Sequence, residues 1–212
     1  PEPSSERTIY LLRHGELAIE PGGKRYIGRS DLPLSPAGVR QAEQWGGFFR
    51  GIPLTAVFSS TLQRALHMAR IIAQGHGVEV SVIPALSEVG LGAWEGLSFA
   101  EVRQSDPHAY EQRGRDPAGH RPPGGESFHD LQKRVVPAFE KAIHGSTGDV
   151  VMVGHAGVNR VLLCHLLGIP LANLFRFDQD HGALNIIVKR AAGYRVRAVN
   201  QRMGWEAELK TR

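Results

Sequence analysis

Residues 9–16 of this chain read Ile9-Tyr10-Leu11-Leu12-Arg13-His14-Gly15-Glu16. The first four are apolar, and such a run near the N-terminus predicts a strand that is buried on both faces of a parallel sheet. An arginine and a histidine follow at its end. Because open α/β sheets bind ligands just outside the carboxyl ends of their strands, this stretch predicts a functional site at Arg13 and His14.

The same pattern recurs far downstream, where Val150-Val151-Met152-Val153-Gly154 leads into His155. Small residues follow, and then an apolar helical face formed by Val158, Val161, Leu162, Leu166 and Leu167. If the two strands are neighbours in a parallel sheet, His14 and His155 face each other across one crevice, with Arg13 beside them. Such a crevice predicts a pocket for an anion.

A third strand-to-helix passage is expected at residues 56–69, with Arg64 in the first turn of the helix. Helix N-termini attract phosphate through their free N–H groups and the macrodipole, and a guanidinium offers a fork of donors that matches phosphate oxygens. Arg64 alone is typical of a solvated helix arginine. Together with the other two segments, it indicates a clamp on a ligand.

Alternating strand and helix patterns predict an α/β fold with three layers, in which helices cover both faces of a mostly parallel central sheet. Further helices are expected after Ser35 with Pro36 at the first position, from the capping box that begins at Ser98, and over residues 127–143 with a bend at Pro137. Residues 106–125 are rich in Pro and Gly and predict an irregular excursion. Further strands are expected near residues 78–83, 175–177, 183–188 and 194–199.

The length of 212 residues with 42% hydrophobic residues predicts a single domain over residues 1–212, with a flexible end at residues 1–6. No apolar stretch approaches the roughly 18–20 residues of a membrane span, and the first residues lack the pattern of a signal peptide. The lone cysteine, Cys164, cannot form an internal disulfide, which is typical of a reducing compartment. A cytoplasmic protein with no membrane partner is expected.

The formal net charge of +4 is spread along the chain without basic clusters, so no nucleic-acid partner is expected. The ten histidines include no His-Glu-x-x-His pattern, and there is no cysteine pair. The sequence therefore predicts neither a metal site nor a cofactor.

Four motifs carry a resemblance to a known family: Arg13-His14-Gly15-Glu16, Ser60 with Arg64-Ala65, residues 86–96, and Gly154-His155-Ala156-Gly157-Val158. Together and in this order they resemble the histidine phosphatase superfamily, in its phosphoglycerate mutase-like branch. The similarity extends from about Thr8 to the final strand. It implies a phosphoryl-transfer enzyme that works without a metal ion.

The resemblance implies that His14 is the nucleophile and forms a phosphohistidine, with Arg13, Arg64 and His155 around the phosphoryl oxygens. The fixed charge of Arg13 disfavours the imidazolium form of its neighbour.

By its position in the family motif, Glu88 is the acid that protonates the leaving oxygen. Glu16 and Glu95 are alternatives that fit better as structural residues bonded to loop backbone. Trp94 lines the mouth of the pocket or packs in the core.

Within the family, residues 16–20 and 92–96 favour a phosphatase over a cofactor-dependent phosphoglycerate mutase, because the serine and asparagine that follow the nucleophile in mutases are missing. Residues 26–34 and 122–128 are similar to α-ribazole phosphatases of cobalamin biosynthesis. Gly28 and Ala156 are the further candidates for binding the substrate, a small phosphate ester. A domain that binds a phosphate ligand or partner without catalysis is the alternative of another class, and a homodimer is also considered.

Overall fold

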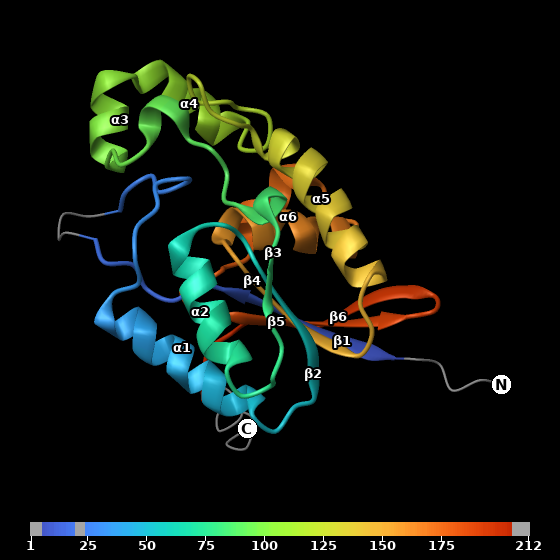
Figure 1. The fold of residues 1–212 in the computed structure, drawn as a ribbon. Helices are drawn as coiled ribbons and strands as arrows, with labels where there is room; N and C mark the ends of the chain where they lie inside the picture. The colour runs from blue at the N-terminus through green and yellow to red at the C-terminus, as the bar shows by residue number, and fades with distance from the viewer. Residues whose placement is uncertain (1–5, 20–23, 205–212) are drawn as a thin grey trace.

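The structure, a computed structural model, describes residues 6–19 and 24–204. Except for Glu6, the expected flexible end at residues 1–6 lies outside the described residues. One six-stranded sheet runs through the fold in the order β3-β2-β4-β1-β5-β6 (Figure 1). The strands are β1 (Arg7–Arg13), β2 (Leu54–Ser59), β3 (Val80–Val82), β4 (Asp149–Gly154), β5 (Leu184–Arg190) and β6 (Gly193–Gln201).

The strands β3, β2, β4 and β1 pair in parallel, whereas β5 and β6 add an antiparallel edge. Helices α1 (Pro36–Phe49) and α2 (Gln63–Ala73) cover one face of this sheet, and α5 (Phe128–His144) and α6 (Ala156–Leu167) cover the other (Figure 1). A separate apolar core fills each interface, one around Trp45 and Met68, the other around Phe139 and Val161. The predicted three-layer α/β fold with a mostly parallel sheet is confirmed.

The pairing of β1 with β4 determines where the site lies. These two strands are direct parallel neighbours, and their register places Leu12 opposite Val153 and Arg13 opposite Gly154. The residue after each strand is a histidine. His14 and His155 therefore emerge at the same edge of the sheet, as the sequence predicted.

The predicted helix starts are confirmed by their caps. The Ser35 hydroxyl accepts a hydrogen bond from the Gly38 N–H, and Pro36 occupies the first helical position of α1. Reciprocal capping boxes begin α3 (Phe99–Ser105) at Ser98 and α5 at Ser127. Ser35 thus satisfies one free N–H group at the start of α1, and each capping box satisfies two at the start of its helix.

The prediction of an irregular excursion at residues 106–125 is wrong for its first half, which forms α4 (Pro107–Arg115). Asp106 caps this helix by accepting a hydrogen bond from the Ala109 N–H, and Pro107 stands at its first position. There the missing N–H of proline costs nothing and its fixed φ favours the helix. Proline and glycine content alone therefore predicts this segment wrongly, because proline favours a helix at its first position and disrupts it only further inside.

The strand expected at residues 175–177 is also wrong, because η3 (Leu171–Arg176) is a 3₁₀ helix. Leu171 and Leu174 are its buried residues, three positions apart, which matches the period of that helix and not of a strand. Two other 3₁₀ turns, η1 (Pro84–Leu86) and η2 (Gly92–Trp94), follow β3. No helix among the described residues has both the length and the apolar character that crossing a membrane would need.

Helix α1 packs backbone to backbone against the loop that follows His14. A Cβ atom on Gly38 would lie 2.1 Å from the Glu16 carbonyl oxygen, and one on Gly15 would lie 2.5 Å from the Gly38 carbonyl oxygen. Neither contact can be relieved by turning a side chain. The loop therefore depends on the missing side chains at both positions.

Gly38→Ala is expected to lower the free energy of unfolding by about 1–3 kcal/mol, because the added methyl group forces the backbone apart. The control is Gly47→Ala in the same helix, where a Cβ atom would meet nothing within 4 Å. That change is expected to raise the stability by up to about 1 kcal/mol. Urea denaturation of both variants measures the difference, and equal effects would contradict the packing described.

Candidate active site

Two imidazoles form the centre of the candidate site. The rings of His14 and His155 have their centroids 5.2 Å apart at an interplanar angle of 59°, and a third ring, His181, lies 5.6 Å from His14. His14 is only 3% exposed and His155 is fully buried. The sheet edge thus gathers three histidines, of which His14 and His155 are buried and His181 is partly buried.

The tautomer of His14 follows from its single hydrogen bond. Its Nδ1 lies 2.7 Å from the Gly15 carbonyl oxygen, which can only accept, so Nδ1 carries the proton. Burial, followed by the electrostatic effect of the neighbouring His155 and the charges of Arg13 and Arg64, holds the pKa of His14 well below its ordinary value. Its Nε2 therefore has a free lone pair, which makes the ring a potential nucleophile or base.

His155 is held by the Ser60 hydroxyl, which lies 2.7 Å from its Nε2 and also accepts a bond from the Leu62 N–H. Its Nδ1 is buried without a partner among the described residues. Burial lowers the pKa of His155 well below its ordinary value, and the charges of Arg64 and Arg13 add to this. The ring is neutral and keeps one nitrogen available for a ligand.

The Arg13 guanidinium is oriented by neutral hydrogen-bond acceptors, and none of those recorded is a carboxylate. Its Nη1 donates to the Gln179 carbonyl oxygen at 2.6 Å, and its Nη2 lies 2.7 Å from Nε2 of His181. Because a guanidinium only donates, that nitrogen accepts and His181 is neutral. Burial lowers the pKa of Arg13 to about 10, and burial together with the charge of Arg13 lowers the pKa of His181 to about 4.

Arg64 is 1% exposed, and the loop after β1 holds it in the same manner. Its two Nη atoms donate to the carbonyl oxygens of Ser30 at 2.7 Å and Gly28 at 2.6 Å. Carbonyl partners leave the positive charge uncancelled. The site therefore presents two oriented cations whose charge is available to an anion.

Three buried nitrogens in this cluster lack a hydrogen-bond partner among the described residues: Nε of Arg13, Nε of Arg64 and Nδ1 of His155, which carries a proton when the Ser60 hydroxyl donates to Nε2. Buried polar groups in proteins are almost always hydrogen-bonded, and each exception calls for an explanation. An anion with several oxygens could accept from all three. The arrangement supports the anion pocket that the sequence predicted.

Glu88 lies at the N-terminus of α6. Its two carboxylate oxygens accept hydrogen bonds of 2.9 Å from the N–H groups of Gly157 and Val89, and the residue is 6% exposed. Its charge opposes the effect of burial on the pKa of Arg13 and Arg64, so it lies near both. A carboxyl group is thus held in a fixed orientation beside the cations.

Sequence reasoning missed Arg134 of α5, which holds the backbone around Glu88. Its guanidinium donates to the carbonyl oxygens of Ala85, Ser87 and Glu88 and pairs with Glu126. The sequence contains no signal for this role, because a helix arginine 46 residues away finds these carbonyls only through the tertiary fold. His181 was missed for the same reason, since it follows no parallel strand.

The two alternative carboxylates bond to loops. Glu95 accepts from the backbone N–H groups of Gly28, Arg29, Ser30 and Leu91 and from the Ser30 hydroxyl. Burial alone would raise the pKa of Glu95, but these bonds outweigh it and the pKa is lowered. Glu16 is exposed and accepts from the Ser35 hydroxyl.

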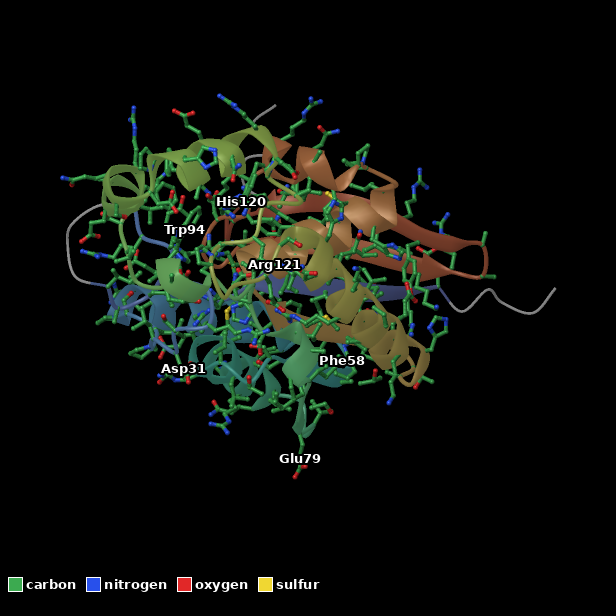
Figure 2. All side chains as sticks on the ribbon, turned by 90° about the horizontal axis from the view of Figure 1, so that it is seen from above. Asp31, Phe58, Glu79, Trp94, His120 and Arg121 are labelled. Carbon is green, nitrogen blue, oxygen red and sulfur yellow. The ribbon has the colours of Figure 1, made fainter. Side chains whose placement is uncertain are left out.

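The remaining candidates surround the cluster. Gly28 uses its N–H for Glu95 and its carbonyl for Arg64, so it positions the arginine. Ala156 is the first residue of α6, beside His155. Trp94 is 3% exposed and stacks on His120 with ring centroids 5.3 Å apart, and Figure 2 shows the two labelled side chains close together. It packs in the core.

No group of three His, Cys, Asp or Glu side chains within residues 6–19 and 24–204 is arranged to hold a metal ion.

The buried neutral histidines predict a stability that falls in acid. The pKa of His181 is about 4 in the folded protein against an ordinary 6.5, so between these values the unfolded chain binds more protons than the folded one. Stability is therefore present above pH 6.5 and is lost as the pH falls toward 4. We expect about 1–2 kcal/mol of loss per buried ring between pH 7 and 5, measured by urea denaturation.

His181→Gln is expected to reduce this pH dependence, because it removes one of the titrating rings. His67→Gln on the exposed side of α2 is the matched control and should leave the slope unchanged. A slope that both variants share with the original protein would contradict the buried neutral state of His181.

Comparison with known proteins agrees with the geometry. A family model described as the histidine phosphatase superfamily (branch 1) matches residues 9–202. A bifunctional protein of Mycobacterium tuberculosis is 37% identical over 91% of this chain, which spans 53% of that protein, or about half its length. A glucosyl-3-phosphoglycerate phosphatase of Mycolicibacterium vanbaalenii is 33% identical, with 79% of this chain and 77% of the relative covered.

Among solved structures, an α-ribazole phosphatase from Shigella flexneri superposes with a TM-score of 0.84 at 28% identity, covering 92% of this chain and 96% of that one. The match of the family model extends from the first described strand to the last and includes every motif whose side chains meet at the sheet edge. The chain belongs to the histidine phosphatase superfamily.

Proposed function

We propose that the protein hydrolyses the phosphate monoester of a small metabolite through a phosphohistidine on His14, without a metal ion. The observation that carries the proposal is the state of His14. Its ring is buried and neutral, its Nδ1 proton is engaged by Gly15, and its Nε2 lone pair lies among fixed cations. A neutral imidazole is the form that can attack phosphorus.

The proposed reaction has two steps. In the first, Nε2 of His14 bonds to phosphorus while the bond to the ester oxygen breaks, and the leaving oxygen takes a proton. In the second, water attacks the phosphohistidine, the nitrogen-phosphorus bond breaks, and inorganic phosphate leaves. Arg13, Arg64 and His155 supply donors to the phosphoryl oxygens throughout, and their fixed orientation means that they need no reorganisation as charge develops.

Glu88 is proposed as the acid of the first step and the base of the second. The N–H groups of Gly157 and Val89 each use one lone pair of its carboxylate and leave others for a proton. These two bonds fix the orientation of the Glu88 carboxylate, and the hydrogen bond from Arg134 to the Glu88 carbonyl oxygen holds the backbone behind it. A rigid proton donor near the ester oxygen is what an alkoxide leaving group requires.

The best candidate substrate is α-ribazole 5′-phosphate. The similarity to an α-ribazole phosphatase over most of both chains supports it, as do residues 26–34 and 122–128. The glucosyl-3-phosphoglycerate phosphatase relative, with higher identity over less of the chain, supports a phosphorylated sugar acid as the second candidate. Both are esters of a small alcohol.

The proposed function is tested by measuring phosphate release from α-ribazole 5′-phosphate, phosphoserine and 3-phosphoglycerate in excess EDTA. We expect turnover with chelator present, the highest kcat/KM for the α-ribazole ester, and an acid-labile phosphoenzyme after rapid quenching. His14→Ala should remove both turnover and phosphoenzyme. Activity that disappears with EDTA and returns with Mg²⁺ would refute the mechanism, and equal rates on all three esters would refute only the substrate.

The role of Glu88 is tested by its dependence on the leaving group. Glu88→Gln is expected to slow an alkyl phosphate by about 10²–10⁴-fold but p-nitrophenyl phosphate much less, because nitrophenolate leaves without a proton. Glu16→Gln, which alters an exposed carboxylate, should show no such contrast. Equal losses on both substrates in Glu88→Gln would exclude Glu88 as the acid.

A further inference from the structure

Beyond the phosphate site, α4 presents an arginine within a ring of aromatic side chains. The Cζ atom of Arg113 lies within cation–π range of four ring centroids, at 5.6 Å from Tyr26, 5.9 Å from Trp94, 5.6 Å from Phe128 and 6.0 Å from Phe175. These rings come from the loop after β1, η2, α5 and η3. Four segments far apart in sequence thus converge on one guanidinium.

Arg113 has no acidic partner among the residues that the structure describes. By contrast, Arg115 pairs with Glu111 and Arg121 with Asp130. Burial lowers the pKa of Arg113, and the Tyr26 hydroxyl only opposes this in part. A half-buried cation that lacks a carboxylate partner gains from a ligand that supplies a further acceptor.

A cavity of about 500 Å³ opens beside this cation. It is lined by aromatic and cationic side chains, including Tyr26, Phe99, Tyr110, Arg113, Phe175 and Arg176. Phe99 and Phe175 are 39% and 49% exposed, so aromatic surface faces solvent at its rim. Its size lies within the usual range of small-molecule sites, which combine apolar walls with a few polar groups.

The buried ring of Phe128 lies between Glu88 of the phosphate site and the aromatic cluster around Arg113. A Cβ atom on Gly157 would lie 2.5 Å from a carboxylate oxygen of Glu88 and 3.1 Å from the ring of Phe128, so these two side chains lie next to each other. The same ring faces Arg113 at 5.6 Å and contacts Phe175 at 5.5 Å. The aromatic cluster that borders the cavity at Phe175 therefore extends through Phe128 to the side chain of Glu88.

Arg160 gives a second connection. Its Cζ lies 5.4 Å from the ring centroid of Phe175. Burial lowers the pKa of Arg160, and the nearby carboxylate of Glu88 opposes this. Phe175 is thus flanked by one arginine on the side of the phosphate site and by Arg113 on the side of the cavity.

We propose that this cavity is the subsite for the leaving group, and that it takes a planar aromatic base with a hydrogen-bond acceptor, as in a nucleoside 5′-phosphate. The rings cover the faces of the base, and Arg113 donates to its acceptor atom. A sugar acid would use the guanidinium but leave the aromatic walls without an apolar partner. The inference rests on the proposed function and specifies the class of its substrate.

The test compares α-ribazole 5′-phosphate with ribose 5-phosphate, which keeps the phosphate and a five-carbon sugar but lacks the base. The ratio of their kcat/KM values measures recognition of the base. Arg113→Met is expected to lower this ratio roughly tenfold, in line with a desolvated cation contact. Arg115→Met on the same helix removes an exposed arginine and should leave the ratio unchanged.

Thermal unfolding of both variants establishes that they fold. A folded Arg113→Met protein with an unchanged ratio would overturn the proposal, and so would an original protein whose ratio is near one. If Arg113→Met selectively loses activity on glucosyl-3-phosphoglycerate, the cavity is a site for a carboxylate. That result would overturn the proposal that the cavity takes an aromatic base.

Binding of the free nucleoside α-ribazole, measured by calorimetry, separates this inference from the proposed function because it needs no turnover. The original protein is expected to bind it, and Phe175→Ala to bind it roughly tenfold more weakly, since one aromatic wall is lost. Binding in a protein without phosphatase activity would refute only the proposed function. No binding to the original protein would overturn the subsite.

Discussion

The parallel pairing of β1 with β4 is the constraint on which the rest of the site depends. Their register places the two strand ends level, so that His14 and His155 emerge side by side. Both strands are buried between two helical layers, and a slip of one residue would turn every side chain to the opposite face. The separation of the two imidazoles is therefore determined by the packing of the whole sheet and not by the loops around them.

The electrostatics of the site follow from how its cations are held. Arg13 and Arg64 are bound by the carbonyl oxygens of Gln179, Ser30 and Gly28, which orient a guanidinium without cancelling its charge. Those charges, added to burial, keep the neighbouring imidazoles neutral. Carboxylate partners would hold the arginines as firmly but would weaken both effects. The carbonyl partners thus leave the pocket positive and its histidines unprotonated.

The layers of the fold, the caps of α1 and α3, the start of α5 and the meeting of His14 with His155 could be predicted, because each depends on local pattern or on strand adjacency. The helix α4 was missed because the prediction for residues 106–125 rested on their Pro and Gly content, although Pro107 stands at a position that favours helices. His181, Arg134 and Arg113 carry no local pattern at all. Their neighbours lie on other segments, so only the tertiary structure brings these contacts together.

The segment that carries α3 and α4 lies beyond one end of the sheet (Figure 1) and buries little of itself. Val102 is the one buried residue of α3, and Ala109 the one buried residue of α4. The free energy of unfolding of such domains is only about 5–15 kcal/mol, and substitutions in a core remove a large part of it. Changes in α3 and α4 are expected to cost less stability, so the proposed subsite at Arg113 can vary between relatives while the cluster around His14 stays unchanged.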